Sequence, residues 1–159
     1  RFAEICNALG LQVIIFSKSF ETIKEKYPHY VSVDLNTILK ESDILSFHCK
    51  PNTDGSPIVT AKEINLMKTS ALILNTARGN LVFENDLYEA LKNNRIRGAA
   101  LDVFNDEPAT NNILFGLENI ILTPHIAAST AESQIIVAEM IANQFVNYFL
   151  NGKVINAIT

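Results

Sequence analysis

Short apolar runs that alternate with helical segments constrain the fold of this chain most strongly. The runs lie at 12–16, 43–47, 71–74, 98–103 and 119–122, with a weaker one at 30–33. Nearly every residue in them is apolar, whereas a strand with one solvated face would alternate apolar and polar residues. Such continuous runs are typical of parallel strands that helices cover on both faces. We therefore predict an α/β fold with a doubly wound, mostly parallel sheet, organised as one compact unit.

Helix signals occupy the stretches between these runs. Residues 60–63 and 129–132 both match the capping box, in which a hydroxyl and a carboxylate three positions apart satisfy the first turn. Asp34 can cap a helix over 35–40. Further helices are predicted over residues 2–9, around the apolar stripe of Leu87, Ala90 and Leu91, and over about 131–150, where Gly152 supplies a left-handed stop.

Composition excludes several classes of protein. A chain of 159 residues with 48% hydrophobic and 19% charged residues is globular rather than disordered or fibrous. Thirteen basic against 17 acidic residues give a net charge of −4, which argues against nucleic acid or an anionic membrane as partner. Cys6 and Cys49 fit neither a disulfide framework nor a metal-ligand spacing, so we expect a cytoplasmic protein without a metal. We also expect no membrane span and no signal peptide.

Polar residues with catalytic chemistry follow the predicted strands. They lie at 75–79, 102–108 and 123–128, and contain Arg78, Asp102, Glu107 and His125. Ligands of an open α/β sheet gather beyond the carboxyl ends of its strands, so these groups should meet at one rim. An arginine can clamp a carboxylate, a histidine can move a hydroxyl proton, and a nearby glutamate can orient the histidine ring. The set suits hydride chemistry on a 2-hydroxy acid.

Each residue also has a simpler interpretation. Arg78 could be a solvated turn residue, His125 a capping or packing residue, and Glu107 with Pro108 a plain turn. Asp102 is harder to dismiss, because burying an unpaired carboxylate costs several kcal/mol. The conjunction of the four groups, rather than any one of them, favours an active site.

The motif Asn75-Thr76-Ala77-Arg78-Gly79, together with Asp102, Glu107 and Thr123-Pro124-His125, resembles the D-isomer-specific 2-hydroxyacid dehydrogenases over the whole chain. Residues 123–134 and the tail at 151–159 are most similar to the phosphoglycerate dehydrogenase branch of this family. The resemblance implies a Rossmann-like NAD(P)-binding domain and an oxidoreductase acting on a D-2-hydroxy acid. D-3-phosphoglycerate is the first candidate substrate, and glyoxylate, hydroxypyruvate or D-lactate the alternatives.

The resemblance also implies a role for each matching position. Arg78 would bind the substrate carboxylate and carbonyl, His125 would be the acid/base, and Glu107 would set the protonation state of His125. Asp102 would hydrogen-bond the nicotinamide carboxamide. The remaining cofactor contacts would come from Thr76, Ala77, Ile126, Ala127 and Ala128, and from Cys49 at the adenosine half. Packing alone is the alternative for Cys49 and the neighbouring His48.

Two departures from the family pattern stand out. The glycine-rich turn and the strand before it would lie upstream of Arg1, so we expect residues 1–150 to be a cofactor domain truncated at its N-terminus. Residues 151–159 would then lead back toward a missing substrate domain. Ser17 and Lys18 stand where an acidic residue would bind the adenosine ribose, which leaves the choice between NAD and NADP open.

Two rival functions remain at this stage. A non-catalytic, cofactor-sensing scaffold, like the family's corepressor-like members, would keep the same residues. A flavodoxin-like signalling domain would share the layers but not the three catalytic-type groups. The long last helix and the Ala-rich segment before it predict a homodimer or higher homo-oligomer.

Overall fold

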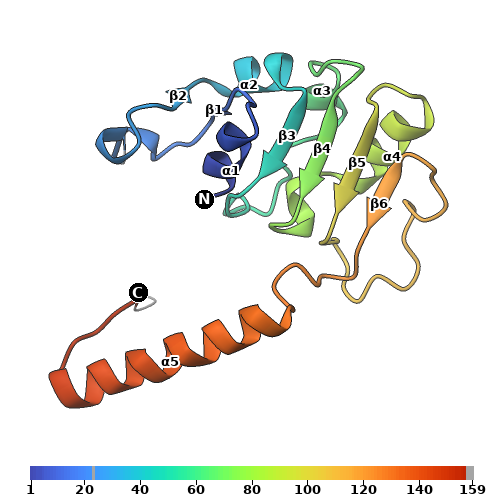
Figure 1. The fold of residues 1–159 in the computed structure, drawn as a ribbon. Helices are drawn as coiled ribbons and strands as arrows, with labels where there is room; N and C mark the ends of the chain where they lie inside the picture. Colours follow the sequence, from blue (N-terminus) through green and yellow to red (C-terminus); the bar gives the residue numbers. More distant parts are fainter. Residues whose placement is uncertain (23, 157–159) are drawn as a thin grey trace.

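A computed structural model describes residues 1–22 and 24–156 of the chain. Figure 1 shows the elements, which follow one another as α1 (Phe2–Ala8), β1 (Ile14–Ile15), η1 (Phe20–Thr22), η2 (Lys24–Lys26), β2 (Val31–Ser32), α2 (Leu35–Glu41), β3 (Ile44–Phe47), α3 (Ala61–Ile64), β4 (Leu72–Asn75), η3 (Gly79–Leu81), α4 (Glu84–Lys92), β5 (Gly98–Leu101), β6 (Ile120–Leu122) and α5 (Ala131–Asn151).

All the strand pairs are parallel, as predicted. The strands β3, β4, β5 and β6 form one sheet in that order, and β1 pairs with β2 in a second, two-stranded sheet. The predicted α/β architecture is confirmed, but its sheet is found in two parts. In the described part of the chain β1 pairs with β2 alone. Within the run predicted at 12–16, only Ile14 and Ile15 form strand pairs.

The helices begin where the capping signals predict, with one exception. The carboxylate of Asp34 accepts a hydrogen bond from the Thr37 amide at 2.7 Å. Thr60 and Glu63 form the predicted capping box at the start of α3. For α5, however, the N-cap is Thr130 and not the predicted Ser129. Thr130 has the extended backbone of a cap and accepts from the Ser133 amide, so Glu132 lies one position too early to close a box.

The core lies between the four-stranded sheet and the helices that cover it. Ile73 of β4 and Leu101 of β5 are buried, and α4 turns Leu87, Ala90 and Leu91 into the same cluster. The predicted apolar stripe of α4 is thereby confirmed. The core fixes the positions of β3 to β6 and therefore of the loops at their carboxyl ends.

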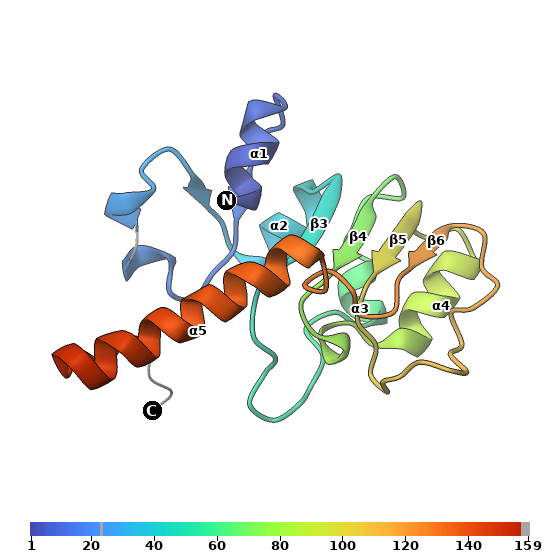
Figure 2. The ribbon, with the colours of Figure 1, turned by 60° about the horizontal axis from the view of Figure 1, so that its bottom comes forward.

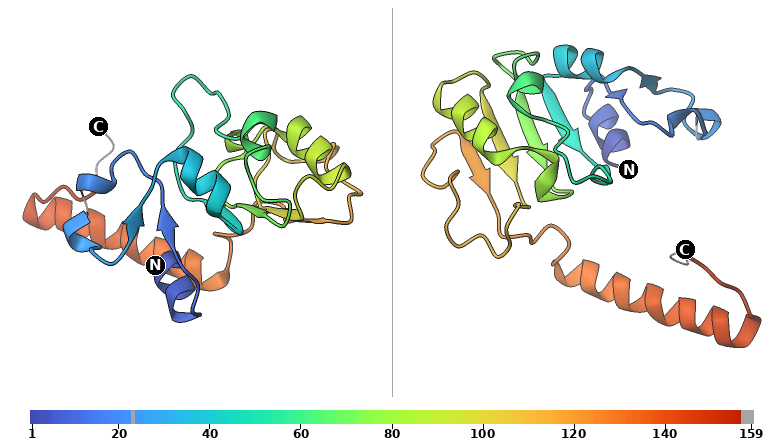
Figure 3. Two further views of the ribbon diagram at one scale, coloured as in Figure 1. Left: turned by 90° about the horizontal axis from the view of Figure 1, so that it is seen from above. Right: turned by 180° about the vertical axis from the view of Figure 1, so that it is seen from behind.

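Helix α5 leads away from this body instead of packing on it. It follows β6 through residues 123–130 and extends past the edge of the sheet (Figures 1 and 3). No residue of α5 is buried against the described chain. The expectation of one compact unit is therefore wrong for residues 131–151, because nothing in the described chain covers their apolar side chains. The predicted end of α5 is confirmed, since Gly152 adopts φ +60°.

The described residues contain neither a membrane-spanning helix nor a cluster of metal ligands. None of their helices combines the length and apolar character needed to cross a membrane. No group of three or more His, Cys, Asp or Glu side chains lies close enough together there to hold a metal ion. Residues 157–159 of the predicted return segment lie outside the described part.

Candidate active site

The carboxyl ends of β4, β5 and β6 are level with one another. Asn75 pairs with Leu101, and Leu101 pairs with Leu122. The ladder continues one residue further, because the Asp102 amide donates to the Asn75 carbonyl at 2.9 Å and the Thr123 amide donates to the Leu101 carbonyl at 3.0 Å. The segments that carry Arg78, Glu107 and His125 therefore leave the sheet at one edge, as the sequence predicts.

His125 and Glu107 are in direct contact at this edge. The Nδ1 atom of His125 lies 2.6 Å from Oε2 of Glu107, and the other carboxylate oxygen accepts from the Phe104 amide at 2.9 Å. The bond to His125, aided by that of Phe104, lowers the pKa of Glu107 below its usual range. Both side chains remain partly exposed. The contact leaves Nε2 of His125 as the ring nitrogen that a ligand can reach.

Asp102 holds the loop that carries His125. It is 3% exposed, and its carboxylate accepts hydrogen bonds from the Thr123 hydroxyl and from the amides of Ile126 (2.9 Å) and Ala127 (2.8 Å). Burial raises the pKa of Asp102, but these bonds outweigh burial and lower it overall. They flank His125, which has a left-handed φ of +54°. A non-glycine residue keeps that conformation only when its surroundings enforce it.

Arg78 lies in a turn that packs against the segment leading to Glu107. The side chain of the buried Asn75 closes the turn, accepting from the Ala77 amide and donating to the Arg78 carbonyl. A Cβ on the next residue, Gly79, would overlap the backbone carbonyl of Phe104. The same Phe104 amide binds Glu107, so a chain of contacts runs from the Arg78 turn to His125.

The guanidinium of Arg78 is exposed at the end of this turn. Its Nη1 donates to the Ala77 carbonyl at 2.6 Å. In the described chain it makes no ion pair with an acidic side chain. Arg78 is therefore available to an anionic ligand.

The remaining predicted residues fall into two places. Thr76, Ile126, Ala127 and Ala128 are exposed, and Ala77 is partly buried, on the segments that carry Arg78 and His125. Ser17 and Cys49 instead line a cavity of about 690 Å³ beyond the carboxyl ends of β1 and β3. Burial raises the pKa of Cys49 and lowers that of the adjacent His48, whose Nε2 lies 3.0 Å from the Ser46 hydroxyl. None of the residues that line this cavity belongs to the Arg78, Glu107 and His125 group.

This division fits an extended dinucleotide. Such a cofactor lies across the carboxyl ends of a parallel sheet, with its two halves at different strands. One half could occupy the cavity at β1 and β3, and the other could reach His125 and the segment after it. The residues present therefore fit the cofactor class that the sequence predicts.

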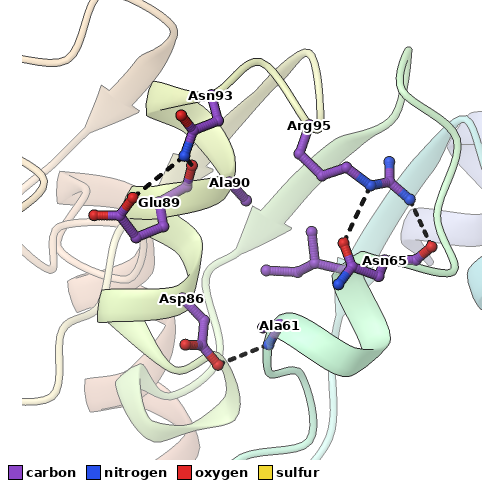
Figure 4. Close-up of a pocket in the computed structure, with 8 residues that line it drawn as sticks. Ala61, Asn65, Asp86, Glu89, Ala90, Asn93 and Arg95 are labelled. Atoms are coloured by element: carbon purple, nitrogen blue, oxygen red, sulfur yellow. Dashed lines mark hydrogen bonds between the residues drawn. The ribbon is translucent and has the colours of Figure 1, made fainter.

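A second hollow, of about 290 Å³, lies between α3 and α4 and holds none of the predicted residues (Figure 4). Asp86 accepts from the Ala61 amide there, and Arg95 binds the side chain and carbonyl of Asn65. These bonds join α4 and the segment after it to α3, so this hollow is structural.

Sequence reasoning missed three residues that build the site: Asn75, Gly79 and Glu84. Glu84, at the start of α4, accepts from the Asn105 amide and the Asn112 side chain, each at 2.8 Å, and so anchors the loop around Glu107. Asn75 and Gly79 flank Arg78 in the motif, which was the available signal. Nothing in the sequence pointed to Glu84, because its partners lie more than 20 positions away.

The comparisons with known proteins identify the family of this chain. The family profile described as D-isomer specific 2-hydroxyacid dehydrogenase, NAD binding domain, matches residues 1–127. The chain therefore belongs to the D-isomer specific 2-hydroxyacid dehydrogenase family, and the match lies in the NAD-binding domain of that family.

Individual relatives narrow the comparison without selecting one substrate. The chain is 37% identical to the glyoxylate reductase of Thermococcus litoralis, over 96% of this chain and 46% of that protein. It is 34% identical to the D-3-phosphoglycerate dehydrogenase of Archaeoglobus fulgidus, over 98% of this chain and 30% of that protein. The chain thus spans less than half of each of these curated relatives.

A solved structure extends the likeness to three dimensions. An acyclic imino acid reductase (Bsp5), in complex with NADPH and D-Arg, superposes with a TM-score of 0.87 at 38% identity. The match covers 99% of this chain and 49% of that one.

Proposed function

We propose that this chain is the cofactor domain of an NAD(P)-dependent oxidoreductase that transfers a hydride to or from C2 of a D-2-hydroxy acid. The observation that carries the proposal is the 2.6 Å contact between His125 and Glu107, at the sheet edge from which the Arg78 turn also leaves. An acid/base, a group that stabilises its charged form and an anion-binding guanidinium are the protein groups that this reaction needs.

The proposed roles of His125, Glu107 and Arg78 follow from which of their polar atoms are already engaged within the protein. His125 uses Nε2 to take the hydroxyl proton during oxidation and to return it during reduction, since Nδ1 is engaged by Glu107. Glu107 stabilises the imidazolium that forms and holds the ring in place. Arg78 binds the substrate carboxylate and polarises its carbonyl. The nicotinamide, when bound, supplies or accepts the hydride.

The cofactor would be held at both parts of the edge. Ser17 and Cys49 would contact the adenosine half from the cavity at β1 and β3. Thr76, Ala77 and Ile126 to Ala128 would line the nicotinamide half. The Oδ2 atom of Asp102 accepts a single bond from the described chain, which leaves it able to accept another from the nicotinamide carboxamide.

D-3-phosphoglycerate, oxidised to 3-phosphohydroxypyruvate on the route to serine, is the substrate that the sequence favours. The likeness to the Archaeoglobus enzyme supports it. The likeness to a glyoxylate reductase supports glyoxylate or hydroxypyruvate as the second candidate. The absorbance change of NADH and NADPH with a panel of these acids and D-lactate, measured on the full-length protein, separates them. A non-catalytic cofactor sensor would bind the nucleotides and reduce none of the panel.

Replacement of His125 tests the chemistry. We expect His125→Gln to lower kcat by about 10²- to 10⁴-fold, the usual contribution of a positioned acid/base. The affinity for the cofactor should stay nearly unchanged, as titration with the dinucleotide would measure. Unchanged turnover would remove His125 from the mechanism. In parallel, Arg78→Lys should raise KM, because an ammonium cannot reproduce the planar fork.

We also propose that the protein is a cytoplasmic homodimer or higher homo-oligomer. Cys6 and Cys49 are free thiols, which suits a reducing compartment. The exposed apolar side chains of α5 support an oligomer.

A further inference from the structure

We infer that the cavity beyond β1 and β3 accepts the 2′-phosphorylated cofactor, NADP, in preference to NAD, with Lys18 and Ser17 binding the phosphate. The inference rests on the proposed function only in taking the ligand to be an adenine dinucleotide. It concerns a choice that the catalytic residues do not make, because none of them lines this cavity.

The charges around the cavity favour an additional anion. Lys18 and Lys50 both line it and are exposed. Neither forms an ion pair with an acidic side chain of the described chain. The one carboxylate in the lining is Asp54, which already accepts from the Ser56 amide at 3.0 Å and from the Ser56 hydroxyl at 2.7 Å. The lining thus contains two lysines without an ion-pair partner in the described chain, and one carboxylate that already accepts two hydrogen bonds.

Other titratable groups near the cavity do not offset this charge. Burial lowers the pKa of His48, which favours its neutral form. The nearest acidic residue along the chain, Glu21, lies outside the lining and pairs with Lys24 at 3.5 Å. The lining therefore keeps a positive balance near neutral pH.

The turn after β1 carries two serine side chains, one on each side of Lys18 in the sequence. Ser17 and Ser19 lie with their Oγ atoms 3.2 Å apart, and the Ser19 amide donates to the Ser17 hydroxyl. The Phe20 amide bonds the Ser17 carbonyl, and the Phe20 side chain is 2% exposed, so the turn is anchored in the protein. An anchored turn that carries two hydroxyls and an ammonium can donate several hydrogen bonds to a phosphate.

The same position lacks the carboxylate that would favour an unphosphorylated ribose. A carboxylate at the end of this strand would accept from both ribose hydroxyls and repel a 2′-phosphate. Ser17 offers one hydroxyl and no charge, so this discrimination against a phosphate is missing. With no carboxylate to repel a phosphate, the charge of Lys18 favours the phosphorylated ribose.

Binding of nucleotide fragments tests the inference without any hydride transfer. We expect the full-length protein to bind 2′,5′-ADP at least about tenfold more tightly than 5′-AMP by calorimetry, because the extra phosphate adds charge-assisted hydrogen bonds. Lys18→Ala should remove most of this difference, and added salt should reduce it. Lys92→Ala, which removes the same charge on α4 outside the cavity, is the control and should leave the difference intact.

A second variant is expected to keep or gain affinity for NAD, a result that a failure to fold could not produce. Ser17→Asp should weaken 2′,5′-ADP and NADP by about tenfold or more while NAD binds as tightly as before or better. Equal affinity of the unmodified protein for the two fragments, or tighter NAD than NADP binding, would overturn the inference and leave the proposed reaction standing. Tight 2′,5′-ADP binding without reduction of any tested acid would instead contradict the proposed function alone.

Discussion

Asp102 shows how one buried carboxylate can position another residue of the site. Its buried carboxylate gathers one hydroxyl and two amides from the segment around His125, whose φ of +54° is uncommon outside glycine. The imidazole then reaches Glu107 at 2.6 Å. We assign Asp102 as a positioning residue for His125, in addition to the cofactor contact proposed above.

Removing the charge of Asp102 should therefore loosen the His125 loop. Asp102→Asn cannot accept all three bonds and turns amide hydrogens toward backbone donors, so we expect a loss of about 1 to 3 kcal/mol in the free energy of unfolding at pH 7. Urea unfolding measures this loss. His125→Gln, which keeps the carboxylate network, is the matched control and should cost less.

The pH dependence of stability should change in the same variant. The pKa of Asp102 is lower in the folded protein than its ordinary value of about 3.9, so its stabilisation is complete above that value and is lost as the pH falls through the folded pKa. We expect a smaller drop in the urea midpoint between pH 7 and pH 3 for Asp102→Asn than for the unmodified protein. An identical drop would contradict this account of Asp102.

Among the elements, the turn between β4 and η3 couples Arg78 to Glu107. Gly79 allows the turn to approach the backbone of Phe104 closely because it lacks a Cβ. The amide of Phe104 in turn donates a hydrogen bond to the Glu107 carboxylate. The turn therefore joins the segments that carry Arg78 and Glu107 and also connects β4 to η3.

Adding a methyl group at this turn should separate the two segments. We expect Gly79→Ala to destabilise the protein by about 3 kcal/mol or more, because the new Cβ meets backbone rather than a flexible side chain, and to lower turnover. Gly55→Ala is the control. Gly55 has φ +75° and open space around it, so that change should cost about 1 to 2 kcal/mol and spare turnover. Equal effects of the two substitutions would show that close approach at Gly79 is unimportant.

At the scale of the whole molecule, α5 is the element that the described chain does not cover. Its large apolar side chains are about half exposed or more, among them Ile135, Met140, Ile141, Phe145, Phe149 and Leu150. Figures 2 and 3 show the helix passing beside the body rather than into its core. Exposed apolar surface on this scale is typical of an interaction site and supports the oligomer proposed above.

Sedimentation velocity should reveal the consequence. If α5 joins copies of the protein, the full-length protein should sediment as a dimer or larger oligomer, and Phe145→Asp with Phe149→Asp should shift it toward the monomer. Glu84→Gln, which alters the loop anchor on another element, is the control for an unspecific effect. A monomer at all concentrations in the unmodified protein would contradict the proposed oligomer.

The sequence by itself determined the fold class and the order of strands and helices, and it predicted the residues of the candidate site. These follow from local rules: continuous apolar runs mark covered strands, capping residues mark helix starts, and polar residues after strands mark the binding edge. Only the tertiary structure gave the 2.6 Å contact between Glu107 and His125 that the resemblance implied, and the bonds by which Asp102 holds the segment around His125, and it placed β1 and β2 in a separate sheet from β3 to β6. These outcomes depend on loop conformations, such as the left-handed backbone of His125, and on contacts between distant segments, which residue type and spacing do not specify.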